Sequence, residues 1–100
     1  MHRKKKVEII TEATVVPRLL DIARQHGVRG STVLPLASGE GHRGTLGGAE
    51  LSSAMAGRMI IFITDADTAQ AVVEAVEALL TPYRMVLMTS DVEVVRDDYF

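Results

Sequence analysis

The sequence predicts an α+β domain with four main strands and two helices in the order β-α-β-β-α-β. Runs rich in β-branched and other apolar residues predict the strands, and apolar residues at helical spacing predict the helices. This order is typical of the ferredoxin-like arrangement, in which both helices cover one face of an antiparallel sheet. The 100 residues of the chain suit one such domain with a single core.

The first half of the chain carries a strand, a helix and a second strand. KVEIIT at 6–11 predicts the first strand, and RLLDIARQH at 18–26 predicts the helix. Pro17 suits the first turn of this helix, and Gly27 stands where a left-handed C-terminal cap is favoured. STVLPLA at 31–37 predicts the second strand.

The second half of the chain carries the other helix between apolar runs. Asp67 can cap this helix, with Gln70 three residues later as in a capping box, and Pro82 ends it. The apolar runs predict a third strand, a fourth strand and a short fifth strand, at 58–64, 85–89 and 92–95.

Two of the predicted strands are apolar at every position, in MIIFI at 59–63 and MVLM at 85–88. A strand with one face in water alternates apolar and polar residues, so both faces of these strands require burial. The two helices can cover only one face of the sheet. We therefore expect further copies of the chain to cover the other face in an obligate oligomer.

The composition argues against several classes of protein. A formal net charge of −2 argues against a basic face for nucleic acid, and the absence of cysteine excludes disulfides, thiolate metal sites and a cysteine nucleophile. The longest apolar run is too short to cross a membrane, so a cytoplasmic location is expected. The three histidines have no metal-ligand spacing and no nucleophile with its base is recognisable, so neither a metal site nor an enzyme is predicted.

A basic run at 3–6 precedes the first strand. It could attract anionic lipid or an acidic partner. No apolar stretch follows it, as a signal peptide would require. We expect a solvated chain end.

A glycine-rich stretch, SGEGHRGTLGG at 38–48, contains the G-x-G-x-x-G spacing of a dinucleotide-binding turn. That motif requires a helix directly after the glycines, and two more glycines stand there instead, so a dinucleotide site is not predicted. Successive glycine N–H groups can still converge on an anion, Arg43 adds a planar cation and His42 a hydrogen-bond donor. The connection at 37–57 has no sustained period, and both an anion-binding loop and a flexible surface loop remain open.

Three segments carry a resemblance to a known family. KVEIIT resembles its first strand, GVRGSTV at 27–33 its approach to the second strand, and DADTAQAVVEAVEALL at 65–80 its second helix. The chain is thus similar to the PII signalling proteins over nearly its whole length. The resemblance implies one domain over 1–100, a mobile T-loop at about 38–57, a homotrimer, and adenine nucleotide bound in clefts between subunits.

One branch of this family is favoured. GEGHR at 39–43 looks most like the Gly-x-Gly-x-Arg turn of PII-like proteins associated with bicarbonate transporters and carboxysomes. The phosphate loop of true PII proteins is reduced to TPYR at 81–84, and 37–57 lacks the tyrosine that nitrogen-sensing members have modified. The resemblance implies a non-enzymatic sensor of ADP, AMP or ATP, with bicarbonate as a candidate second ligand. Its partner would be a membrane transporter of bicarbonate, which would recruit it to the membrane, or a carboxysome-related protein.

The resemblance also implies which residues bind the nucleotide. Some line the adenine cleft, some form the phosphate turn, and two arginines reach phosphate, of which Arg84 is the weaker candidate. The isoleucines also suit the core. The implied nucleotide-binding residues are Ile10, Thr32, Gly39, Gly41, His42, Arg43, Ile61, Ile63, Arg84 and Arg96.

Two alternatives keep the fold and change the function. One is a CutA-like trimer that binds metal or only assembles, against which the few histidines, the absence of cysteine and the glycine loop weigh. The other is a stand-alone module that binds an amino acid or another small effector, which would need no phosphate turn.

Overall fold

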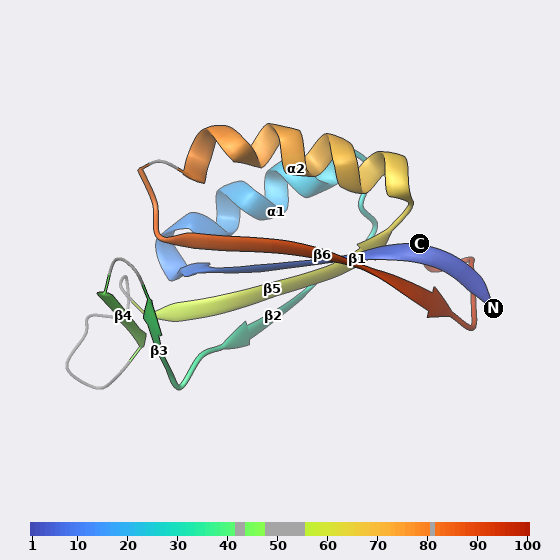
Figure 1. Cartoon of the computed structure of the whole chain (residues 1–100). Coiled ribbons are helices and arrows are strands. Elements are labelled where there is room, and N and C mark those ends of the chain that lie inside the picture. The colour runs from blue at the N-terminus through green and yellow to red at the C-terminus, as the bar shows by residue number, and fades with distance from the viewer. Residues whose placement is uncertain (42–43, 48–55, 81) are drawn as a thin grey trace.

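The computed structural model describes residues 1–41, 44–47, 56–80 and 82–100, with only the backbone at 38–41, 44–47 and 80. Figure 1 shows the elements and their arrangement. In chain order they are β1 (His2–Glu12), the 3-10 turn η1 (Ala13–Val15), α1 (Val16–Gln25), β2 (Thr32–Pro35), β3 (Ser38–Gly41), β4 (Gly44–Gly47), β5 (Gly57–Thr64), α2 (Ala66–Leu80) and β6 (Met85–Val94).

The main sheet confirms the predicted ferredoxin-like fold. Its strands lie in the order β2-β5-β1-β6, and each neighbouring pair is antiparallel. Both helices cover the same face of this sheet (Figure 1). Among the described residues no helix lies over the opposite face, as the element order predicts.

The core lies between the helices and this sheet. Alternate residues of β1 and β5 point toward the helices, because side chains alternate across a strand. Thr11 and Thr64 continue the two buried rows at the strand ends. The buried apolar residues are Val7, Ile9, Val15, Leu19, Ala23, Val28, Ile60, Phe62, Ala69, Val72 and Val76.

The ends of α1 follow the sequence signals. Pro17 lies in the first turn, where its missing N–H would have no helical partner. Gly27 has φ of 100°, a left-handed conformation that side chains with a Cβ rarely adopt. The predicted C-terminal cap is thus confirmed.

The predicted capping box of α2 is wrong. The carbonyl of Asp65 already accepts the Ala69 N–H at 2.9 Å, so Asp67 lies inside the first helical turn. Gln70 Nε2 donates to Glu74 Oε1 at 3.0 Å, an (i, i+4) contact along the helix. The other end is as predicted, since α2 ends at Leu80, before Pro82.

The predicted solvated N-terminal end is also wrong. β1 begins at His2, and its first residues pair with the end of β6. The predicted fifth strand at 92–95 is not separate, because β6 runs without a break to Val94. Acidic residues of β6 face the basic run: Lys5 lies opposite Asp91, with 2.7 Å between Nζ and Oδ1. Such cross-strand charge pairs stabilise the start of β1, which has no apolar pattern from which a strand could be predicted.

The predicted loop at 37–57 contains regular backbone. β3 and β4 form a separate two-stranded antiparallel sheet, with Ser38 opposite Gly47 and Gly41 opposite Gly44. Residues 42–43 and 48–55 lie outside the described part of the chain. The sequence missed these strands because glycines interrupt any side-chain period.

Candidate functional site

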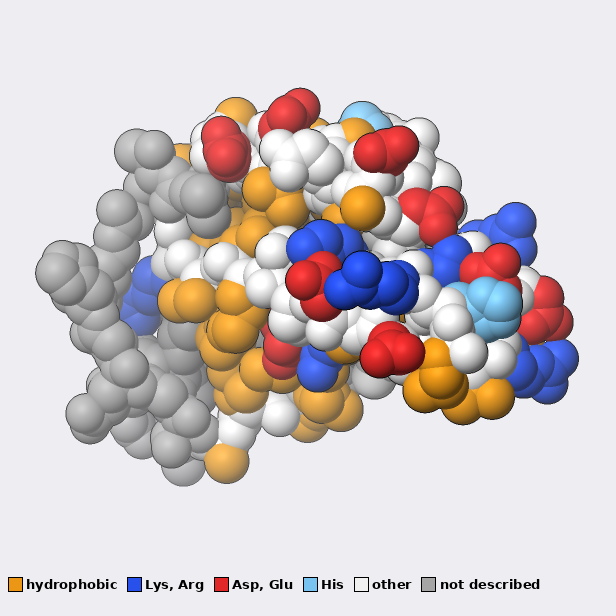
Figure 2. All heavy atoms as spheres, turned by 45° about the vertical axis from the view of Figure 1, so that its right-hand side comes forward, with side chains coloured by type: hydrophobic (Ala, Val, Ile, Leu, Met, Phe, Trp, Pro, Cys, Tyr) orange, Lys and Arg blue, Asp and Glu red, His pale blue; other side chains and the backbone are white. Residues whose placement is uncertain are grey.

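The face of the sheet opposite the helices, called the open face below, is rich in apolar side chains. Ile10, Met59, Ile61 and Ile63 are half-buried there, whereas Leu34, Val86 and Met88 are exposed. Figure 2 shows hydrophobic side chains gathered on the lower side of the molecule. In the described part of the chain, the doubly apolar strands thus have one face in the core and the other face partly exposed.

Four of the candidate residues lie together on the open face. Thr32 of β2 lies directly opposite Ile61 of β5, and directly paired residues share a face. Ile10 of β1 lies opposite Met59, two residues from Ile61. Ile63 follows two residues after Ile61 on the same strand. The strand register therefore brings together the residues implied for the adenine cleft.

The residues implied for the phosphate turn fall in or beside β3. Gly39 lies opposite Leu46 of β4, and Gly41 opposite Gly44. His42 and Arg43 lie outside the described residues. Their role as a phosphate turn remains a prediction.

Arg84 lies directly before β6, at the same end of the sheet as the connection to β3. Its carbonyl oxygen accepts a hydrogen bond of 2.9 Å from the Thr11 hydroxyl. The side chain of Thr11 is fully buried, so the bond fixes the backbone at Arg84 against the end of β1.

Arg96 lies two residues beyond the other end of β6. Its Nη2 donates to Asp98 Oδ2 at 3.1 Å, and its guanidinium carbon lies 4.5 Å from the centre of the Tyr99 ring. Such a cation–π contact adds to the ion pair in orienting an exposed guanidinium. All three side chains are exposed.

The two arginines lie at opposite ends of the sheet. Thr11 pairs with Met85, the residue after Arg84, whereas His2 pairs with Val94 near Arg96. Thr11 lies nine positions after His2, and at about 3.3 Å per residue the two are about 30 Å apart. Figure 1 shows β3 and β4 at one end of the sheet and both chain termini at the other. Arg84 and Arg96 of one chain therefore do not meet at one ligand.

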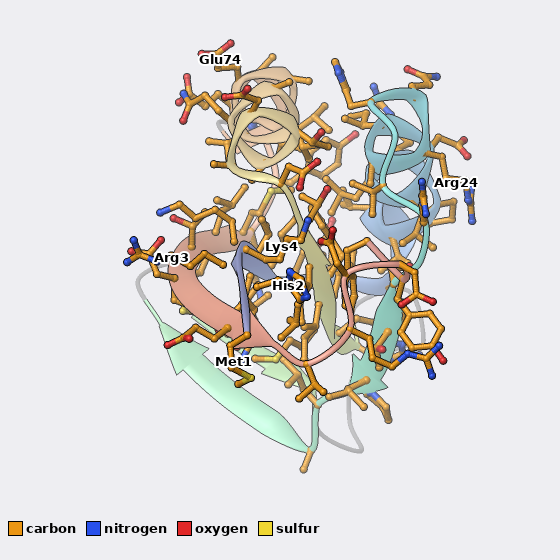
Figure 3. The ribbon with its side chains drawn as sticks, turned by 90° about the vertical axis from the view of Figure 1, so that its right-hand side faces the viewer. Met1, His2, Arg3, Lys4, Arg24 and Glu74 are labelled. Atoms are coloured by element: carbon orange, nitrogen blue, oxygen red, sulfur yellow. The ribbon has the colours of Figure 1, made fainter. Side chains whose placement is uncertain are left out.

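A charged cluster that the sequence analysis missed lies at the end of the sheet that carries the termini. Lys4 Nζ is 2.6 Å from Asp65 Oδ1 and 2.8 Å from Asp97 Oδ1. Figure 3 looks onto this end, with His2 and Lys4 near its centre and Arg3 pointing outward. The sequence contains one indication of this cluster. The basic run at 3–6 is opposite in charge to the acidic residues among 91–98.

Ion pairs at this end of the sheet shift the pKa values of Lys4, Asp97 and Asp91. The Lys4 ammonium donates hydrogen bonds to Asp65 and Asp97, and these raise the pKa of Lys4 above its ordinary value. The bond to Asp65 has the larger effect. The hydrogen bond from the same ammonium lowers the pKa of Asp97. Lys5 lowers the pKa of Asp91 in the same way. Each of these three shifts favours the charged form of the group concerned.

The described part of the chain contains neither a cluster of metal-ligating side chains nor a membrane-spanning helix. It contains no group of three or more His, Cys, Asp or Glu side chains arranged to hold a metal ion. No helix in that part is both long enough and apolar enough to cross a membrane.

Comparison with known proteins decides the family. The family model described as nitrogen regulatory protein P-II matches residues 4–99. The chain belongs to the P-II family. No curated protein sequence matches the chain.

Solved structures place the chain near one kind of P-II relative. CPII from Thiomonas intermedia K12, a nitrogen regulatory PII-like protein solved with ADP, AMP and bicarbonate, is 26% identical with a TM-score of 0.91, covering 99% of this chain and 94% of that one. A second CPII structure, bound to ADP and bicarbonate, is 26% identical with a TM-score of 0.89 and covers 99% and 95%. A putative PII-like signaling protein from Thermus thermophilus shares the fold at 20% identity, with a TM-score of 0.81 and coverage of 99% and 96%. The resemblance to the P-II family and to its CPII branch is thus confirmed.

Proposed function

We propose that this P-II family member is a homotrimeric, non-enzymatic sensor of adenine nucleotide, with its sites between subunits. Through the T-loop at about 38–57 it regulates a partner in inorganic-carbon uptake or carboxysome function. The protein acts in the cytoplasm, and a bicarbonate transporter is the partner that would recruit it to the membrane. The family match favours this function over a CutA-like metal-binding or assembly role.

The grouping of Thr32, Ile10 and Ile61 on the open face is the observation that carries this proposal. An apolar surface beside a threonine hydroxyl suits a purine ring, which needs stacking contact and a few hydrogen bonds. CPII, the relative that is 26% identical over nearly the whole chain, was solved with ADP and AMP bound. We therefore propose that the base of an adenine nucleotide binds to the open face of this protein.

Trimer formation is supported by the same face. Exposed apolar side chains such as Val86 and Met88 favour burial against another copy of the chain. A closed ring of three copies can cover all three open faces without leaving one free. The single domain over 1–100 would be the repeating unit.

The phosphates require groups from two copies. Gly39, Gly41, His42 and Arg43 would form the turn in one copy, with Arg84 at the same end of its sheet. Arg96 lies at the opposite end, so it would reach the phosphates from a neighbouring copy. Arginine suits this role because its planar fork binds phosphate oxygens in pairs.

Bicarbonate is the proposed second ligand. CPII was solved with bicarbonate alongside ADP, and in another structure with acetate alongside ADP and AMP. Both are small planar anions with a carboxylate-like group, which backbone N–H groups and arginine can bind. Binding of both ligands would couple energy state and carbon supply to the T-loop.

Titration calorimetry with ADP, AMP and ATP, each with and without bicarbonate, tests this function. We expect one nucleotide bound per chain and a change in its affinity when bicarbonate is present. Light scattering on the same samples should give the mass of three chains. A trimer that binds no adenine nucleotide would favour a different small effector, and the proposed function would be wrong.

A further inference from the structure

The segment after β6, residues 95–100, carries Arg96 and has little regular structure of its own. Among the described residues, contacts with distant parts of the chain hold it in place. Arg29 Nη1 donates to the Asp98 carbonyl at 3.2 Å, and the Lys4 ammonium pairs with Asp97. Within the segment, the Phe100 N–H closes a turn on the Asp97 carbonyl at 3.2 Å. The position of Arg96 thus depends on contacts made by its neighbours.

Lys4 differs from the other lysines of the basic run. Its side chain is only 8% exposed, whereas that of Lys5 is 34% exposed. Its ammonium joins three parts of the chain: β1, the junction of β5 with α2 at Asp65, and the C-terminal segment at Asp97. Removing this charge would leave two partly exposed carboxylates without their shared cation, and it would remove one of the contacts that hold the C-terminal segment.

Asp97 is the residue directly after Arg96. The ion pair at Asp97 therefore fixes the backbone from which the Arg96 side chain projects. Asp98 and Tyr99 then orient the guanidinium, one through its carboxylate and the other through its ring. A group held in its binding geometry before the ligand arrives loses less entropy on binding.

We propose that Lys4 is a positioning residue for nucleotide binding, which holds Arg96 through Asp97 where the guanidinium can reach the phosphates. This role rests on the proposed function, in which Arg96 contacts a nucleotide bound mainly by a neighbouring copy. Lys4 itself does not touch the nucleotide. It strengthens binding of the phosphates only by holding Arg96 in position.

Two variants remove the contact, and two matched variants spare it. Lys4→Met and Asp97→Asn break the pair to the C-terminal segment. Lys5→Met removes the same charge from the same strand but breaks only its pair with Asp91. Asp65→Asn removes the other partner of Lys4 and leaves the pair with Asp97.

Calorimetric titration of each trimer with ADP gives the comparison. We expect Lys4→Met and Asp97→Asn to weaken ADP binding about two- to fivefold, the effect of losing a partly exposed ion pair. Lys5→Met and Asp65→Asn should bind ADP as the parent does. If Lys4→Met fails to form the trimer, Asp97→Asn carries the test, because Lys4 then keeps one carboxylate partner.

A double-mutant cycle separates positioning from general destabilisation. In an Arg96→Ala background, Lys4→Met and Asp97→Asn should cause no further loss of ADP affinity, since the group they position is gone. Amide exchange at residues 96–100 should be faster in Lys4→Met than in Lys5→Met. An equal loss in both backgrounds, or parent-like ADP affinity in both Lys4→Met and Asp97→Asn, would overturn the positioning role alone. A parent trimer that binds no ADP would overturn the proposed function instead.

Discussion

Replacing Val86 by glutamate tests whether a second copy covers the open face. Val86 is 54% exposed in the single chain and lies opposite Ile10, while Met88 on the same face is 41% exposed. Full burial of such a side chain is worth about 1.5–3 kcal/mol, so about half of that remains to be gained by each on assembly. Over these two side chains in three copies, the gain comes to about 5–9 kcal/mol per trimer.

Glutamate at this position has different consequences for a monomer and a trimer. In a monomer the carboxylate would stay in water, and the free energy of unfolding would change by no more than about 0.5 kcal/mol. In a trimer each copy would bury an unpaired charge, at a cost of several kcal/mol per ion. We therefore expect Val86→Glu to give monomer or aggregate in place of the trimer.

Size-exclusion chromatography with light scattering at micromolar concentration measures this outcome, and urea unfolding checks the fold. Ala78→Glu is the matched control, because Ala78 is exposed on α2 away from the open face. The reasoning would be refuted by a Val86→Glu trimer with parent-like unfolding. A parent protein that is a stable, soluble monomer would refute it as well.

Three further predictions concern the ligand, the loop and the pH. In calorimetric titrations, Arg43→Ala should weaken ADP and ATP binding by about 1.5–3 kcal/mol, which is roughly ten- to hundredfold. Arg43→Lys should recover part of this affinity, and the control Arg24→Ala should lose none. Amide exchange over residues 40–56 should slow when nucleotide binds, and slow exchange already present in the empty protein would contradict a switching role. Because the pKa of Asp97 is lowered, its ion pair stabilises the fold above about pH 4 and loses this effect as the pH falls further. The difference in urea midpoint between the parent and Lys4→Met should therefore be smaller at pH 3 than at pH 7.

The sequence predicted the parts of the fold that depend on local apolar patterns and backbone conformation. Pro17 and Gly27 predicted the ends of α1. The fixed φ angle of proline suits the first turn of a helix, and the positive φ angle after the last turn favours glycine. The apolar runs marked the central strands because both of their faces are apolar. The start of β1 was missed because it is stabilised by charges on a strand about 90 residues away, which no local window contains.

The capping box was wrongly predicted and the β3–β4 hairpin was missed, for different reasons. Asp67 and Gln70 have the required spacing, but a start two residues earlier gives Asp65 the first helical hydrogen bond. Propensity signals place a helix end only within one or two residues, because neighbouring starts differ little in energy. In the hairpin, glycine-rich strands have no side-chain alternation from which a strand could be inferred.

The candidate site shows a further limit of local reasoning. Register places Thr32 beside Ile61, a contact between residues 29 positions apart that the family resemblance implied and that no spacing rule would give. Lys4 was assigned to a solvated end because an isolated lysine run gives no sign of its partners. Its two carboxylates come from the β5–α2 junction and the C-terminal segment, which only the folded sheet brings together.

In the proposed site, the separation of Arg84 and Arg96 would couple trimer formation to nucleotide binding. A site that needs one arginine from each end of the sheet cannot be completed within one chain, whose sheet keeps the two about 30 Å apart. Nucleotide binding and trimer formation would then each stabilise the other, because a ligand held by two copies favours the state in which they meet. In such a protein the open face and the Lys4 pair have related roles. The open face would bring the copies together, and Lys4 would present the arginine that each copy contributes to its neighbour.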